Sequence, residues 1–212
     1  TLVSGSALAE LNQSAPTAEQ LQADIAAAIQ GAVAQARGQS PAAVQSAVET
    51  AVAKVVGSTQ APPAVVNVAM AQAVKSLPAD VAATPGVQPA LEHQQAAVVA
   101  TAITAAVSSA ARANADATPA ERQAAVKAAI DQTLAAADAP PAVDNIAMAS
   151  AVSTLNTQGV TNNPSVASAV TQAQTTVVAQ AITAAVQTAV ANTAGASAAD
   201  QQEAVQQAIS QT

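Results

Sequence analysis

The chain has 212 residues, with no aromatic residue and no cysteine, and it carries six Lys plus Arg against thirteen Asp plus Glu, a net charge of −7. Without cysteine it forms no disulfide and offers no thiolate metal ligand. The acidic balance argues against nucleic acid, which needs a clustered basic footprint, and against an anionic membrane surface. Hydrophobic residues make up 51% of the chain and charged residues 9%, so we expect a folded protein with a core of small side chains.

Hydropathy predicts no membrane insertion. The most apolar window, residues 96–107, is about 12 residues long, whereas a membrane-spanning helix needs about 20. The first residues lack the basic start of a signal peptide. Leu2–Ala9 could be the trace of a cleavage region, but Leu8 and Leu11 fit better as packing residues of a first helix.

An internal repeat organises the sequence. The proline-flanked segment Ala61–Leu77 returns 78 residues later as Ala139–Leu155, with Ala-Pro-Pro-Ala-Val and Ala-Met-Ala in both. An Ile-containing apolar motif begins at Ile25, Ile103 and Ile182. We interpret the chain as about two and a half copies of a helical unit of short, long and medium helices. The expected domains are a partial N-terminal unit, a helical hairpin, at 1–60, and full units at 61–138 and 139–212.

The first helices are predicted from caps and periodicity. Thr17 and Gln20 have the spacing of a capping box, which places a helix start after Pro16. Ser40 and Pro41 begin a second helix. Gly38 is expected to end the first helix and Gly57 the second, and the short connection predicts an antiparallel hairpin. The apolar stripes of the two helices are Leu21, Ile25, Ile29 and Val33, and Val44, Val48, Val52 and Val55.

The next unit follows the same logic. A short helix from Pro63 to about Leu77 is stopped by Pro78, and residues 78–85 are expected to form a loop. A long helix then runs to about Ala113, and the Thr118–Glu121 capping box begins a medium helix. The residues expected to line their inner faces are Val65, Val68, Ala69, Gln72 and Ala73, then Leu91, Val98, Val99, Ile103 and Val107, then Val126, Ile130 and Leu134.

The last unit repeats these elements. Pro140-Pro141 opens a short helix, Gly159 breaks the chain, and Asn163-Pro164 caps a long helix to about Thr193. Ser197 caps a final helix that carries Val205 and Ile209. Alanine content and four-residue spacing predict an all-α fold of tandem-duplicated units with close-packed Ala/Val-rich helices. The predicted stripe of the long helix is Val166, Val170, Val177, Val178, Ile182, Val186 and Val190.

The search for chemistry predicts no catalytic, cofactor-binding or metal-binding residue and no enzyme. His93 is the only histidine, and beside Glu92 it could act as a base or ligand. No second ligand is evident, and Thr171 and Gln172 take these places in the next unit, so we expect His93 on the exposed side of the long helix. Calcium loops, nucleophile elbows and phosphate loops are missing from the sequence. Met70 and Met148 are expected to fill the core.

One stretch carries a family resemblance. Asn163–Gln172, followed by Val177 and Val178, resembles the opening segment of the small bacterial proteins that assemble into coiled refractile bodies (R-bodies). The pairs Gln94-Gln95 and Gln201-Gln202 and the Ala-Pro-Pro-Ala and Ala-Met-Ala stretches are also similar. The chain lacks the aromatic residues of that family and its spacing departs from it. The resemblance implies a self-assembling structural subunit.

Low charge and small, amide-rich surfaces predict a structural protein that polymerises with copies of itself into an extracellular or cell-surface fibre, sheet or layer. The segment Thr1–Val56 is expected to dock on the carboxyl end of a neighbour. The alternative is a non-enzymatic helical binding or adhesion module on the cell surface, and a third reading is a lipid-surface coat, which the alanine-dominated faces do not favour. Secretion is expected from the composition and the missing cysteines.

Overall fold

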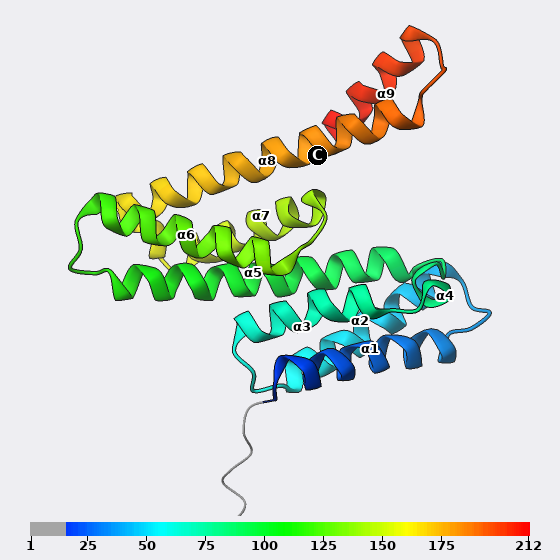
Figure 1. The fold of residues 1–212 in the computed structure, drawn as a ribbon, viewed down its shortest axis with the longest axis horizontal. Helices are drawn as coiled ribbons and strands as arrows, with labels where there is room; N and C mark the ends of the chain where they lie inside the picture. The colour runs from blue at the N-terminus through cyan, green and yellow to red at the C-terminus, as the bar shows by residue number, and fades with distance from the viewer. Residues whose placement is uncertain (1–15) are drawn as a thin grey trace, which may run out of the picture.

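The computed structural model describes residues 16–212, so Leu2–Ala9 and Leu11 lie outside the described residues. Between residues 16 and 212 the regular elements are all helical, which confirms the all-α prediction (Figure 1). The elements are α1 (Ala18–Gln35), α2 (Pro41–Ser58), α3 (Pro63–Ser76), α4 (Ala79–Ala82), α5 (Val87–Ala113), α6 (Pro119–Ala137), α7 (Pro141–Thr157), the 3₁₀ turn η1 (Val160–Asn162), α8 (Pro164–Asn192) and α9 (Ala198–Ser210).

The predicted N-terminal caps form. The Thr17 hydroxyl accepts the backbone N–H of Gln20 at 3.2 Å, and the Gln20 side chain accepts the Thr17 N–H at 3.0 Å, which completes a capping box. Thr118 and Glu121 make the equivalent pair at the start of α6. Ser40 caps α2 through its hydroxyl. Each cap satisfies backbone N–H groups that the first turn leaves free, so these starts are fixed locally.

Three local predictions were wrong. Gly57 does not end α2, because the helix continues through it to Ser58. The expected loop at 78–85 contains the short helix α4. In α3 the buried face is centred on Val66 and Met70, whereas Gln72 is exposed. Adjacent valines and alternating alanines allow several helical faces, and contacts of α3 with α1, α5 and α6 decide among them.

The chain forms two hydrophobic cores that share one helix (Figure 1). The first core joins α1, α2, α3 and the first half of α5. The second joins the rest of α5, α6, α7 and the first half of α8. Along α5, Leu91 and Val98 face the first core, whereas Val99, Ile103 and Val107 face the second. The cores therefore overlap the expected unit boundary between α2 and α3.

Buried amides connect the two cores at the C-terminal end of α6. Asn67 of α3 donates from Nδ2 to the Thr133 carbonyl at 3.0 Å. Gln95 of α5 donates from Nε2 to the Ala137 carbonyl at 3.2 Å. The Ala137 carbonyl belongs to the last turn of α6, whose carbonyls have no partner within the helix, so the Gln95 amide satisfies a group that would otherwise be buried unpaired.

A close backbone approach fixes the start of α5. Gly86 lies at its N-cap with φ +95°, and an added Cβ would lie 2.1 Å from the carbonyl oxygen of Pro41 at the start of α2. Only glycine combines this left-handed conformation with that contact. The first core therefore depends on glycine at this position.

We predict that Gly86→Ala destabilises the protein by at least about 2 kcal/mol, because the side chain adds both a clash and left-handed strain. Urea unfolding followed by circular dichroism measures the change. Gly31→Ala is the matched control: Gly31 lies inside α1 with open space around it, so alanine there should stabilise by about 0.5–1 kcal/mol. Equal stabilities of the two variants would contradict the close approach.

Candidate functional site

His93 pairs across two helices and not with its sequence neighbour. Its Nδ1 lies 3.1 Å from Glu49 Oε1 on α2, and the Glu49 carboxylate also accepts from Gln45 Nε2 at 2.9 Å. Glu92 accepts from Gln88 at 3.0 Å. The His93 side chain is 66% exposed, which confirms the predicted exposure. This contact joins the surfaces of α2 and α5, and because the His93 side chain is largely in solvent it contributes little to stability.

In residues 16–212 no three His, Asp or Glu side chains lie close enough together to bind a metal ion. Met70 and Met148 are fully buried, one in each core, which confirms that they fill the interior. Flexible thioether side chains suit the irregular gaps between alanine-rich helices.

Asp144, in the first turn of α7, is the one carboxyl group with a strongly perturbed environment among the described residues. Its Oδ1 is buried without a hydrogen-bond partner. Burial, and secondarily the negative charge of Asp138, raise the pKa of Asp144 to about 7. Asp138 itself pairs with Lys75 of α3. Ionising this buried carboxyl therefore costs stability.

We predict that stability falls as pH rises from about 4, the ordinary pKa of Asp, to about 7, because the unfolded chain ionises first and the folded carboxyl resists ionisation. Asp144→Val should remove this slope and raise the melting temperature at pH 8 by a few degrees. Asp144→Asn is the matched control, since it cannot ionise but keeps a buried polar group. It should be as flat with pH as the valine variant and less stable. A parental slope that persists in both variants would exclude Asp144 as its cause.

Helix α5 alone, among the described residues, is long and apolar enough to cross a membrane by length and composition. It is longer than the window at 96–107 on which the expectation of no insertion was based. Both cores bury part of it, and a buried core helix meets the same criterion.

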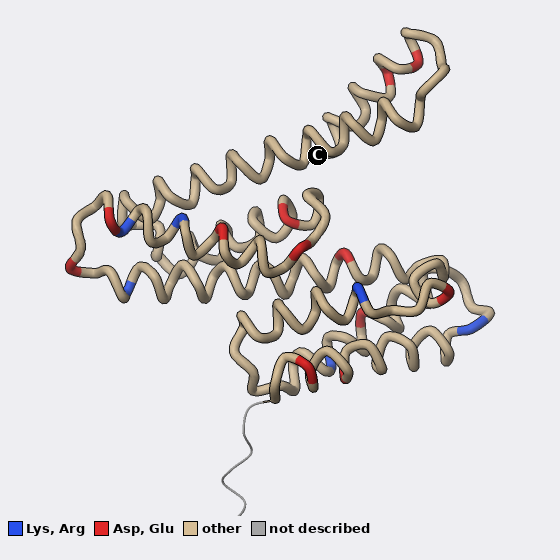
Figure 2. Tube along the Cα trace, in the orientation of Figure 1, with Lys and Arg blue, Asp and Glu red and all other residues tan. Residues whose placement is uncertain are grey.

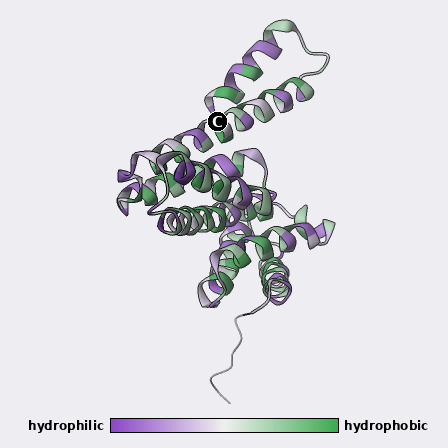
Figure 3. Cartoon of the chain, turned by 60° about the vertical axis from the view of Figure 1, so that its left-hand side comes forward, coloured by the Kyte–Doolittle hydropathy of each residue, from purple (hydrophilic) through white to green (hydrophobic). Residues whose placement is uncertain are grey.

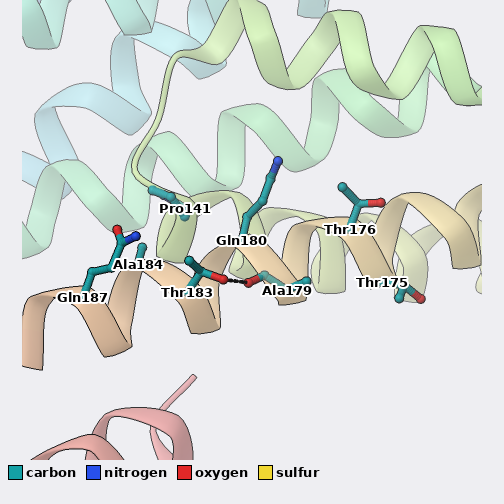
Figure 4. A pocket seen from close by; sticks show the side chains of 8 residues that line it. All are labelled: Pro141, Thr175, Thr176, Ala179, Gln180, Thr183, Ala184 and Gln187. Atoms are coloured by element: carbon teal, nitrogen blue, oxygen red, sulfur yellow. Dashed lines mark hydrogen bonds between the residues drawn. The ribbon is translucent and has the colours of Figure 1, made fainter.

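The surface of α8 carries no charged side chain from Pro164 to Asn192 (Figure 2). A shallow groove beside Pro141 is lined by threonine, glutamine and alanine residues of α8 (Figure 4). Its threonine hydroxyls already donate to carbonyls one turn back, as Thr183 does to Ala179 at 2.8 Å and Thr176 to Gln172 at 3.0 Å. The groove therefore lacks the convergent polar groups that a small-molecule site needs.

The C-terminal half of α8 and α9 form a hairpin that projects from the two cores (Figure 1). No residue of α9 is buried. The predicted stripe of α8 is buried only as far as Val177: Ile182 and Val186 are partly covered, and Val190 is 50% exposed. On α9, Ile209 is 46% exposed. Hydrophobic residues lie along both helices of this hairpin (Figure 3), and among the described residues α8 is the helix in extensive contact with α9.

An open groove runs along this hairpin between α7, α8 and α9. Its walls are mostly alanine, threonine and glutamine, and Ile146 of α7 lies at its edge with 53% exposure. Asn145 of α7 donates from Nδ2 to the Thr212 carbonyl at 2.9 Å across it. The groove is apolar and uncharged, which suits a helix better than a polar ligand. We regard it as the candidate functional surface.

Comparison of the chain with protein-family models, curated proteins and solved structures finds no match.

Proposed function

We propose that the chain is a structural subunit, built from tandem helical units, that assembles with copies of itself into an extracellular or cell-surface fibre, sheet or layer. The observation that carries the proposal is the uncovered apolar face of the α8–α9 hairpin. The sequence of this hairpin repeats that of two others, α1–α2 and the second half of α5 with α6, and both of these are covered by further helices in the two cores. Three pairs of matching contacts support the duplication of this hairpin.

The turns that join long and medium helices are held alike. Arg122 donates from Nε to the Asn114 carbonyl at 2.9 Å and from its guanidinium to the carbonyl three residues later at 3.1 Å. At the position 79 residues on, Gln201 donates to the Thr193 carbonyl at 3.2 Å and again three residues later at 3.3 Å. An arginine in one turn and a glutamine in the other thus donate to carbonyls at corresponding positions, which favours two copies of one motif.

The short helices also repeat a contact. Asn67 of α3 donates to the Thr133 carbonyl, and Asn145 of α7 donates to the Thr212 carbonyl. Both residues of the second pair lie 78 or 79 positions after those of the first. The short helix of one unit therefore reaches the end of the following medium helix in both cases. This contact supports a shared plan that extends to α9.

On this plan α1–α2, the second half of α5 with α6, and the second half of α8 with α9 are corresponding hairpins. The first is covered by α3 and α5, and the second by α7 and α8. Nothing described covers the third. Residues that are 0% exposed in the second hairpin have partly or largely exposed counterparts in the third. The pairs are Ile103 and Ile182, Val107 and Val186, Val126 and Val205, and Ile130 and Ile209.

Association would stabilise this face. Completing the burial of a valine or isoleucine is worth a fraction of the roughly 1.5–3 kcal/mol for its full burial, and four such residues line the face. Helix α8 carries no charged residue, so charge repulsion along it is weak. Alanine-rich walls allow close helix contact. These properties favour self-association over binding of a polar partner.

The expected docking of Thr1–Val56 on a neighbour would compete with contacts that α1 and α2 make within the chain. Helices α1 and α2 already pack on α3 and α5 of the same chain, where Leu21, Ile25 and Val48 are buried. Removing this segment would uncover the first core and change more than assembly. The proposal is therefore tested on the intact chain.

We predict regular filaments or sheets in negative-stain electron microscopy of the purified chain, with light scattering that rises across a hundredfold concentration range. The physical reason is the apolar face that each copy presents. A particle with the mass of one chain at every concentration would contradict assembly and would favour the binding or adhesion module.

A further inference from the structure

We infer that the cavity beside the α1–α2 turn is a binding site for a guanidinium group, the end of an arginine side chain or of free arginine. The cavity lies at one end of the first core, between the turn at 36–40 and helix α4, and holds about 620 Å³. Ligand pockets usually hold about 300–1,000 Å³. Binding there goes beyond the proposed function and does not depend on assembly.

The α1–α2 turn shares its backbone plan with two later turns. The N–H of Gln39 donates to the Ala36 carbonyl at 3.0 Å, and the matching distances are 3.2 Å between α5 and α6 and 2.9 Å between α8 and α9. A serine or threonine cap follows each turn, and a helix begins at the next residue. Gly38 and Gly195 share a left-handed φ, +81° and +92°. We therefore expect the carbonyls of the first turn to converge as those of the later turns do.

A planar N–H donor lies against the carbonyls of both later turns. Arg122 donates from its guanidinium to carbonyls of the α5–α6 turn at 2.9 and 3.1 Å. Gln201 donates from Nε2 to carbonyls of the α8–α9 turn at 3.2 and 3.3 Å. Each donor is the fourth residue of its helix, and the fourth residue of α2 is Val44. The first turn thus has a carbonyl cradle without the side chain that serves it elsewhere.

The cavity lies where that donor would be. Val44, which is 4% exposed, forms part of its floor, and a valine side chain has no N–H to donate. The turn residues that correspond to the Arg122 contacts also line it: Ala36, Arg37 and Gln39. Among the described side chains that form hydrogen bonds near the turn, none uses these carbonyls: Ser40, Gln45 and Thr84. A ligand can therefore supply the donor that the chain supplies in the later turns.

The walls fit the rest of an arginine. Val33 and Val81 line the cavity with Val44, and such apolar walls suit the methylene stem of the side chain. Asp80 of α4 also lines it, and no ion pair of the described residues includes this carboxylate. A guanidinium can donate to carbonyls and to a carboxylate at once because its five N–H groups form a planar fork. The exposed Arg37 at the same wall offers a partner for the carboxylate of free arginine.

Nuclear magnetic resonance titration of the full chain with N-acetyl-arginine methylamide tests the site. We expect saturable shifts of the amide signals of residues 36–44 and 80–84. N-acetyl-lysine methylamide should bind at least about tenfold more weakly, because an ammonium lacks the planar fork. Absence of saturable shifts with the arginine probe, or equal affinity for the two probes, would overturn the inference.

Val44→Gln places the donor of the α8–α9 turn in the first turn. Its amide should satisfy the carbonyls and lower the affinity for the arginine probe at least about tenfold. Val44→Thr is the matched control: it also introduces a polar group at this buried position, but its side chain is too short to cross the cavity, so it should keep most of the affinity. Equal losses would show a general disturbance of the core and contradict the cradle.

Asp80→Ala is a second variant that leaves the core intact, since Asp80 is exposed. Loss of the carboxylate should weaken the arginine probe about fivefold, and unchanged affinity would contradict the assigned site. Circular dichroism melting of each variant checks that the helices are retained.

Two further ligands distinguish the sources of the guanidinium. Tighter binding of free arginine than of the peptide Gly-Gly-Arg-Gly-Gly, lost in Arg37→Ala, would support a site for the amino acid. Tighter binding of the peptide would support a partner segment that inserts an arginine. Filament formation is measured separately, so failure of the site leaves the proposed assembly standing, and failure of assembly leaves the site standing.

Discussion

The structure depends on helices that are too long for one core to cover. Helix α5 has 27 residues, a length of about 40 Å at 1.5 Å per residue, whereas α1 has 18. Its apolar residues change sides near Ala96 and Val98, so that α1–α3 bury one half and α6–α8 the other. Two small cores thereby become one body without a flexible linker. Helix α8, with 29 residues, begins the same arrangement, but only its first half is covered.

Small side chains make this sharing necessary and place demands on the junction. Alanine contributes little burial energy, so each core needs several helices in close contact. At the end of α6 the amides of Asn67 and Gln95 donate to the carbonyls of Thr133 and Ala137. The Asn67 Oδ1 remains without a partner, which costs stability. The junction thus exchanges some polar satisfaction for tight packing, as Asp144 does at the start of α7.

Local chemistry was predictable from the sequence, and long-range contacts were not. Thr17, Ser40 and Thr118 set helix starts through neighbours three residues away, so their motifs were sufficient. The face of α3 depends on three other helices, and the partner of His93 lies 44 residues away on α2. The apolar stripe of α8 was visible, but its periodicity could not show where covering helices stop. The uncovered part of the α8–α9 hairpin is defined by that stop, and only the fold reveals it.

The order of the helices determines how each hairpin is covered. Each covered hairpin is buried by helices that follow it: α1–α2 by α3 and α5, and α5–α6 by α7 and α8. Within residues 16–212 the first core therefore has both its hairpin and its covering helices, whereas the described residues hold no helices that cover the α8–α9 hairpin. Helix α9 has no buried residue, and its Ile209 lies on the uncovered side, so within residues 16–212 this hairpin has the two packed helices of a core without the pair of helices that covers the other two hairpins.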